Sequence, residues 1–191
     1  FAADADVRSR RTALAALSNI GDPAAAEALA KAAEADTVYD RGHAASLYLG
    51  FARRLAEAGK KKECVRACRD LIRARVEPRD RHILCDALAI LVGVEGEGAL
   101  DDLLAALGNP DKQVREAALT LTARIPGEAV TRKLVAALKG AATDPRAEIV
   151  GALGRRGDRS ALPAVLAALK DEEKVVRLAA VEAAVRFGGE K

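Results

Sequence analysis

Three successive stretches of this chain repeat with a period of 31 residues. The interval separates leucines and arginines at matching places, Leu107, Leu138 and Leu169 together with Arg115, Arg146 and Arg177. A period of about 20 to 50 residues is typical of stacked arrays whose unit is a short supersecondary element. No single unit can bury its apolar face alone, so its neighbours must complete it. The repeat therefore predicts an all-α chain of stacked helical pairs.

The composition agrees with stacked helices. Half of the residues are hydrophobic, yet the chain has no Trp or Met and only three Phe and two Tyr, and Ala, Leu and Val supply most of the apolar surface. Small side chains let helices pack closely. A run of about 18 apolar residues would indicate a membrane-spanning helix, and the sequence contains none. We therefore expect a soluble protein.

Capping and turn residues divide the repeat into helices. Asp22-Pro23 offers an N-cap side chain before a proline at the first helical position. Glu77-Pro78 separates two helices, because the residue before a proline is pushed out of helical geometry. Asn109-Pro110-Asp111 provides the turn within a later pair. The pairs are expected at 23–35 with 39–58, 61–75 with 79–93, 98–108 with 111–125, 127–140 with 145–155, and 159–170 with 173–187.

The repeat predicts one domain over residues 1–191, with about five and a half helical pairs and a period clearest over 61–188. The half pair is the opening segment, where Val7-Arg8 corresponds to Val114-Arg115 in a second helix. The first helix of that pair is absent, and the chain starts with Phe1 rather than Met. We therefore expect the sequence to be part of a longer chain.

The clearest copy runs from Gly157-Asp158-Arg159-Ser160-Ala161-Leu162-Pro163 through Asp171 to Val176-Arg177. This segment resembles the HEAT-like repeat of the bilin-lyase (PBS lyase) type, and Asn109-Pro110-Asp111 leading to Val114-Arg115 is similar. The resemblance is strong over 97–188, looser over 61–96 and partial over 5–58. It implies a right-handed α-solenoid, an α-α superhelix with one helical layer lining a concave face. The repeat name does not transfer lyase activity, because fold does not fix function.

The resemblance also implies a ladder of charged side chains between neighbouring repeats. In such repeats the Asp of the turn and the Arg after Val often pair. The positions that match this pattern are Asp111 with Arg115, Asp144 with Arg146, and Asp171 with Arg177.

Positive charge is concentrated in one repeat. From Arg53 to His82 the chain has 11 Lys and Arg against 5 Asp and Glu, although its overall net charge is only +3. Such a surface could bind phosphates or an acidic protein, or it could be an ordinary solvated helix face. The candidate binding residues are Arg53, Arg54, Arg66, Arg69, Arg73, Arg79 and Arg81.

Cys64, Cys68, His82 and Cys85 are the residues with metal-ligand chemistry. Zinc sites usually use closely spaced pairs in loops, whereas Cys64 and Cys68 are four residues apart on a predicted helix. Free cysteines also pack as small apolar residues. We expect core cysteines and no metal or cofactor, with a Cys68 to Cys85 disulfide as the alternative in an exported protein.

No catalytic motif stands out. The chain has two histidines, His43 and His82, and neither accompanies a nucleophile in a recognisable pattern. The Gly-rich stretch 93–98 lacks the Lys of a phosphate-binding loop and fits a helix end. We therefore expect a chain that is not an enzyme.

These observations predict a non-catalytic protein-binding or scaffold module that presents its concave helical layer and the basic surface to an acidic protein partner. A nucleic-acid-binding module that uses the basic repeat 53–82 is one alternative, and an accessory or lyase-like subunit of an enzyme is another. We expect no membrane insertion. The compartment stays open between the cytoplasm, which we prefer, and export after signal cleavage.

Overall fold

The computed structural model describes residues 6–74 and 78–188. Its contacts divide the chain into two compact units, unit 1 (Phe1–Gly96) and unit 2 (Glu97–Lys191). All regular structure in the described ranges is helical, and no strand occurs there. The prediction of an all-α solenoid of helical pairs is confirmed. One continuous repeat domain over 1–191 stays a prediction.

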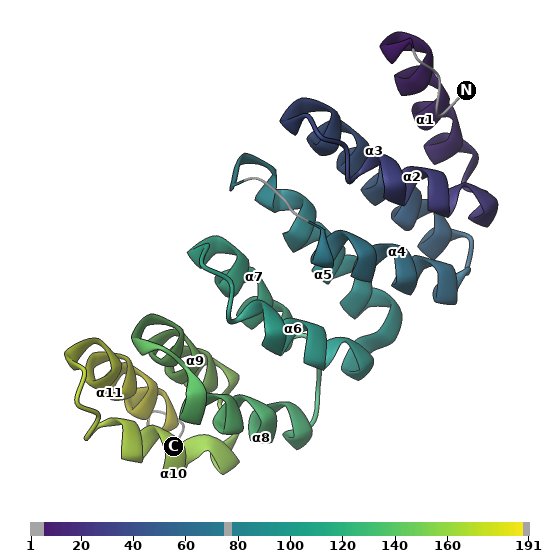
Figure 1. Cartoon of the computed structure of the whole chain (residues 1–191). Helices are drawn as coiled ribbons and strands as arrows, with labels where there is room; N and C mark the ends of the chain where they lie inside the picture. The colour runs from purple at the N-terminus through teal and green to yellow at the C-terminus, as the bar shows by residue number, and fades with distance from the viewer. Residues whose placement is uncertain (1–5, 75–77, 189–191) are drawn as a thin grey trace. The chain divides into compact units, whose positions relative to one another are not determined.

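Unit 1 is built in two layers (Figure 1). Its elements are α1 (Val7–Ile20), the 3-10 helix η1 (Pro23–Ala25), α2 (Ala26–Ala32), α3 (Val38–Glu57), α4 (Lys61–Arg73), η2 (Pro78–Asp80) and α5 (Arg81–Glu95). Helices α1, α3 and α5 follow one another in one layer, and α2 and α4 form the other. Helix α3 contacts all four of the other helices, so the core of the unit surrounds it.

Unit 2 has the same two-layered organisation. Its elements are η3 (Gly96–Ala99), α6 (Leu100–Ala106), α7 (Lys112–Thr122), α8 (Glu128–Ala137), η4 (Leu138–Gly140), α9 (Thr143–Arg156), η5 (Arg159–Ala161), α10 (Leu162–Ala168) and α11 (Lys174–Gly188). Helices α7, α9 and α11 form one layer, and α6, α8 and α10 pack against them in sequence order. Within the described ranges, none of the helices combines the length and apolarity that a bilayer span needs.

Within the described residues the helices lie where the turn residues predict them, with two local differences, whereas the predicted turn residue Glu77 lies outside the described residues. The segment after Asp22 starts as η1 before it becomes α2, because the Asp22 carboxylate accepts the Ala24 amide at 2.9 Å and tightens the first turn. Helix α9 begins at Thr143 and not at Pro145. A proline is tolerated there because the first turn of a helix has no internal acceptors for its amides.

Small residues set the closest contacts between helices. Gly154 on α9 lies against Ala183 on α11, and a Cβ added to Gly154 would come within 2.6 Å of both the Cα and the Cβ of Ala183. Gly151 on the same helix has room, since an added Cβ would meet only the end of the flexible Arg155 side chain at 3.4 Å. The contact between α9 and α11 therefore depends on the missing side chain at Gly154.

This contact generates a prediction with an internal control. Gly154→Ala forces α9 and α11 apart and should lower the free energy of unfolding by about 1–3 kcal/mol. Gly151→Ala removes the conformational freedom of a helical glycine without a clash and should raise it by about 0.5–1 kcal/mol. Urea unfolding followed by circular dichroism measures both. Equal effects of the two substitutions would contradict the packing that the structure shows.

Candidate protein-interaction surface

Helices α3, α7, α9 and α11 are each anchored by an arginine at their fourth residue. Arg115 of α7 donates from Nη1 to the carbonyl oxygens of Asn109 and Pro110, at 2.9 and 3.0 Å. Its Nε and Nη2 donate to the two carboxylate oxygens of Glu148 on α9, each at 2.8 Å. Arg115 is only 7% exposed. One buried guanidinium thus ties its own turn to the following helical pair, with every bond charge-assisted.

The same position is used in other repeats. Each of these arginines donates from Nη1 to a carbonyl of the turn before its helix: Arg41 to Ala35 at 2.8 Å, Arg146 to Ala141 at 3.3 Å, and Arg177 to Asp171 at 2.8 Å. Arg146 in addition forms an ion pair with Asp171 of the following helical pair, with 3.0 Å between Nε and Oδ2. We call this recurring contact the arginine clamp.

The structure shows the predicted ladder residues in an offset arrangement. Arg146 pairs with Asp171 across two helical pairs, while Arg115 pairs with Glu148, which was not among the predicted residues. The Asp111 carboxylate accepts the Gln113 amide at 2.8 Å and caps α7. Asp144 lies exposed in the first turn of α9, and Arg177 contacts backbone carbonyls.

The sequence pattern also did not predict a structural role for Arg156, at the end of α9. Arg156 donates to the carbonyls of Thr122, Ile125 and Gly127, at 2.8 to 2.9 Å, and to the Thr131 hydroxyl at 2.9 Å. The positions 31 residues away hold Ile125 and Phe187, so the repeat gives no reason to expect an arginine there. A charged residue at an otherwise apolar repeat position was the available signal.

The basic surface centres on α4. Lys62, Arg66, Arg69 and Arg73 are separated by four, three and four residues, so they share one face of the helix. The opposite face is buried and consists of Cys64, Ala67, Cys68 and Leu71. We call the first four residues the α4 stripe.

Several of the predicted basic residues already have partners. Arg69 forms an ion pair with Glu95 at 2.7 Å, and Arg53 forms one with Asp86. Arg54 donates to Asn19 Oδ1 at 2.8 Å. Arg79 lies 3.6 Å from the Asp80 carboxylate in an exposed pair, and Arg81 is half-buried at the start of α5.

The other three members of the α4 stripe differ from Arg69, which is paired with Glu95. Lys62, Arg66 and Arg73 are exposed and form no ion pair within the described part of the chain. The start of α4 adds Lys60 and Lys61, and Lys60 occupies the N-cap position without a capping side chain. Positive charge is unfavourable at a helix N-terminus, where the helix dipole prefers anions. Local stability at this helix end therefore does not account for the positive charge.

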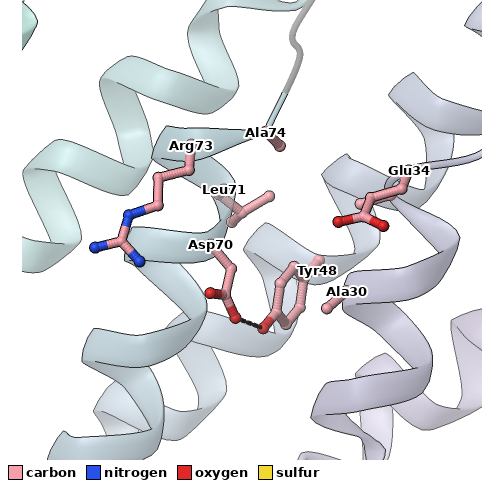
Figure 2. A pocket seen from close by; sticks show the side chains of 8 residues that line it. Ala30, Glu34, Tyr48, Asp70, Leu71, Arg73 and Ala74 are labelled. Carbon is pink, nitrogen blue, oxygen red and sulfur yellow. Dashed lines mark hydrogen bonds between the residues drawn. The ribbon is translucent and has the colours of Figure 1, made fainter.

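A pocket of about 310 Å³ lies at the C-terminal end of the stripe, between α2, α3 and α4 (Figure 2). Tyr48 reaches it from α3 and donates its hydroxyl hydrogen to Asp70 Oδ2 at 3.0 Å. Burial and the neighbouring Asp70 carboxylate raise the pKa of Tyr48, so its hydroxyl stays protonated and remains a donor at neutral pH. Arg73 belongs both to this lining and to the stripe.

The cysteines are free thiols in the structure. Cys64 and Cys68 are fully buried and hydrogen-bonded to each other, and Cys85 is half-buried. The hydrogen bond that the Cys68 thiol donates to Cys64, together with burial, raises the pKa of Cys68. Among residues 6–74 and 78–188, no group of three His, Cys, Asp or Glu is placed to hold a metal ion. His82 is exposed near the start of α5.

His43 lines a second pocket, of about 290 Å³, between α1, α2 and α3. The Asp40 carboxylate in this pocket accepts from the Thr37 hydroxyl at 2.6 Å and from Arg11 Nη2 at 2.8 Å. These hydrogen bonds hold the pKa of Asp40 below its usual range, so the carboxyl group stays ionised. The His43 ring stacks on Tyr39. This chemistry favours binding over proton transfer, because Asp40 is a poor general acid.

The arginine clamp generates a stability prediction. Arg115→Met leaves the half-buried Glu148 without its guanidinium and should lower the free energy of unfolding by about 3 kcal/mol. Lys112→Met is the control, since it removes an exposed pair with Glu116 at 3.5 Å and should cost less than about 0.5 kcal/mol. The double variant Arg115→Met with Glu148→Met should recover part of the loss. Urea unfolding that shows no such recovery would contradict the clamp.

The thiols give a second prediction. A soluble aromatic disulfide reagent should leave Cys64 and Cys68 unmodified in the native protein, because both are buried and Cys68 is kept as a thiol. In denaturant all three cysteines should react. A Cys85→Ser variant isolates the buried pair. Fewer than three reactive thiols in the unfolded, unreduced protein would show a disulfide.

Comparison with solved structures gives two designed or engineered proteins among its matches. An engineered protein from the Northeast Structural Genomics Consortium is 16% identical, with coverage of 98% of this chain and 93% of its own and a TM-score of 0.42. A designed armadillo repeat protein is also 16% identical, with coverage of 97% and 96% and a TM-score of 0.42. The sequence matches no curated protein.

Two family models match separate parts of the chain. The model of the PBS lyase HEAT-like repeat matches residues 9–35, and the model of HEAT repeats matches residues 131–191. The first match covers much of α1 and α2, and the second covers α8 through α11. These matches show HEAT-type repeats in a segment of each unit and, with helical pairs in both units, support a HEAT-like repeat protein.

Proposed function

We propose that this protein is a non-catalytic protein-binding module that binds an acidic segment of a protein partner along the α4 stripe. HEAT-like folds are typical of scaffold and protein-interaction modules, which gives the general class. The observation that carries the specific proposal is the row of exposed cations that form no ion pair with a described residue, Lys62, Arg66 and Arg73, together with the lysines at the start of α4. Unpaired cations on one face favour acidic partners.

The dimensions of the stripe define the segment it would bind. From Lys62 to Arg73 the helix rises about 16 Å, at about 1.5 Å per residue. An extended peptide covers that length with about five residues, at about 3.3 Å each. The buried opposite face of α4 holds the helix against α3 and α5, so the stripe is a rigid surface. A short acidic segment in extended conformation therefore fits it.

The proposal is narrower than the surface expected from the sequence. Arg53 and Arg54 lie on α3, in the other layer of unit 1, and bind Asp86 and Asn19. Breaking these contacts would offset part of what a partner could gain. We therefore leave Arg53 and Arg54 out of the proposed contact.

A nucleic-acid partner is the alternative outcome. Single-stranded nucleic acids usually stack bases on exposed aromatic rings. The aromatic ring at the stripe, Tyr48, is 1% exposed and bound to Asp70, and the exposed Tyr39 lies beside Arg11 of α1. Stacking at the stripe therefore has no platform among the described residues. The basic surface favours a protein carboxylate partner over a base-stacking one.

The test is charge reversal on α4 against an equal reversal in unit 2. Lys62→Glu with Arg66→Glu and Arg73→Glu should weaken binding of a fluorescent hexaglutamate peptide at least about tenfold at low salt. Arg124→Glu with Arg132→Glu and Arg159→Glu changes net charge equally, at exposed positions outside α4, and should have a much smaller effect. Fluorescence anisotropy measures both.

The same titration distinguishes the alternatives. If a generic DNA duplex binds more tightly than the peptide through the same α4 residues, the partner is a nucleic acid and not a protein. Equal losses in the two triple variants would show that only net charge matters and would overturn the proposal.

A further inference from the structure

The pocket at the end of the α4 stripe has the opposite charge from the stripe. Glu34, in the turn after α2, is exposed at its edge, and Asp70 of α4 is half-buried within it. In Figure 2 both carboxylates lie on the side of the Tyr48 ring, while the guanidinium of Arg73 extends away from them. The basic surface thus ends in a hollow whose inner polar groups are acidic.

The Asp70 carboxylate has capacity for another donor. The Tyr48 hydroxyl donates to Oδ2 and so fixes the orientation of the carboxylate, while within the described residues no donor contacts Oδ1. An ionised carboxylate accepts about four hydrogen bonds. The Glu34 carboxylate likewise forms no hydrogen bond or ion pair with a described residue. A cation in the pocket would find two acceptors already in place.

The wall of the pocket is apolar. Ala30 of α2, the C-cap residue Ala33 and Leu71 of α4 line it beside the Tyr48 ring, and Ala33 is 3% exposed. The volume of about 310 Å³ is at the lower end for ligand pockets and suits a single long side chain. Lys and Arg combine an apolar stem with a charged tip, so they match an apolar wall that carries carboxylates.

The acidic side chain of Asp70 is not expected on a surface that binds only acidic ligands. It lies between Arg66 and Arg73 along α4, four residues from one and three from the other. A purely acidic ligand on the stripe would be repelled by Asp70 and Glu34. A ligand with one cation at this end would turn that repulsion into attraction.

We propose that the pocket takes a Lys or Arg side chain of the same partner whose acidic segment binds the α4 stripe. The partner's recognition element is then an acidic stretch of about five residues with one basic residue beside it. This inference rests on the proposed function and adds the specificity that the stripe lacks, because many acidic segments would satisfy the stripe alone.

The experiment uses the whole chain and two matched peptides. The lysine probe has five glutamates, two glycines and one lysine, and the glutamine probe has glutamine in place of the lysine. Each is also made in the reverse order, because either chain direction fits the stripe. Anisotropy at low salt should show that the better-oriented lysine probe binds about fivefold or more tightly than its glutamine counterpart.

Neutralising the pocket should change the affinities of the two probes in opposite directions. Glu34→Gln with Asp70→Asn should weaken the lysine probe about fivefold and slightly tighten the glutamine probe, since repulsion of glutamates is reduced. Glu27→Gln with Glu57→Gln is the charge-matched control at exposed positions outside the pocket, and it should tighten both probes slightly. Ala30→Leu narrows the pocket without changing charge and should weaken only the lysine probe.

The outcomes separate this inference from the proposed function. If both probes depend on the α4 stripe but bind equally, the pocket does not take a basic side chain, and this inference is overturned while the proposed function stands. The same conclusion follows if neutralising the pocket tightens the binding of both probes. If neither probe depends on the stripe, both proposals are overturned. Circular dichroism of each variant confirms that the helices remain folded.

Discussion

The arginine clamp is the interaction on which the geometry of the repeats depends. A helical pair needs its turn held and its neighbour aligned, and the guanidinium of Arg115 does both, with bonds to turn carbonyls and to Glu148. Lysine could not replace it, because a single ammonium cannot satisfy four acceptors in a planar arrangement. The clamp is a local contact within each unit, and it recurs at the fourth residue of α3, α7, α9 and α11.

Small apolar residues determine how closely the neighbouring helices pack. The contact of Gly154 with Ala183 brings α9 and α11 close together in unit 2. In unit 1, Ala30 of α2 and its C-cap residue Ala33 line the pocket beside Tyr48 together with Leu71 of α4, and these side chains leave it unfilled. The same alanine-rich composition therefore gives dense packing in one place and a hollow in another, depending on which side chains lie opposite.

Periodicity predicts the helices and the clamp arginines, because both recur with the repeat. It does not predict Glu148, because the positions 31 residues before and after it hold Ala117 and Ala179, or Arg156, which stands where the adjacent copies have Ile125 and Phe187. The basic face of α4 follows from residue spacing, but the partners of Arg69 and Arg53 lie on α5 and appear only in the folded structure. The pocket is likewise a product of packing, since its lining comes from three helices.

The central claim is that α4 is the surface through which this HEAT-like repeat protein meets an acidic partner. The most direct measurement is a titration of the hexaglutamate peptide into isotope-labelled protein, followed by amide chemical shifts in two-dimensional nuclear magnetic resonance. The account predicts salt-sensitive shifts concentrated on the amides of Lys61 to Arg73 and on the neighbouring end of α2. Shifts concentrated on the layer of α1, α3 and α5, or spread evenly over both units, would contradict it.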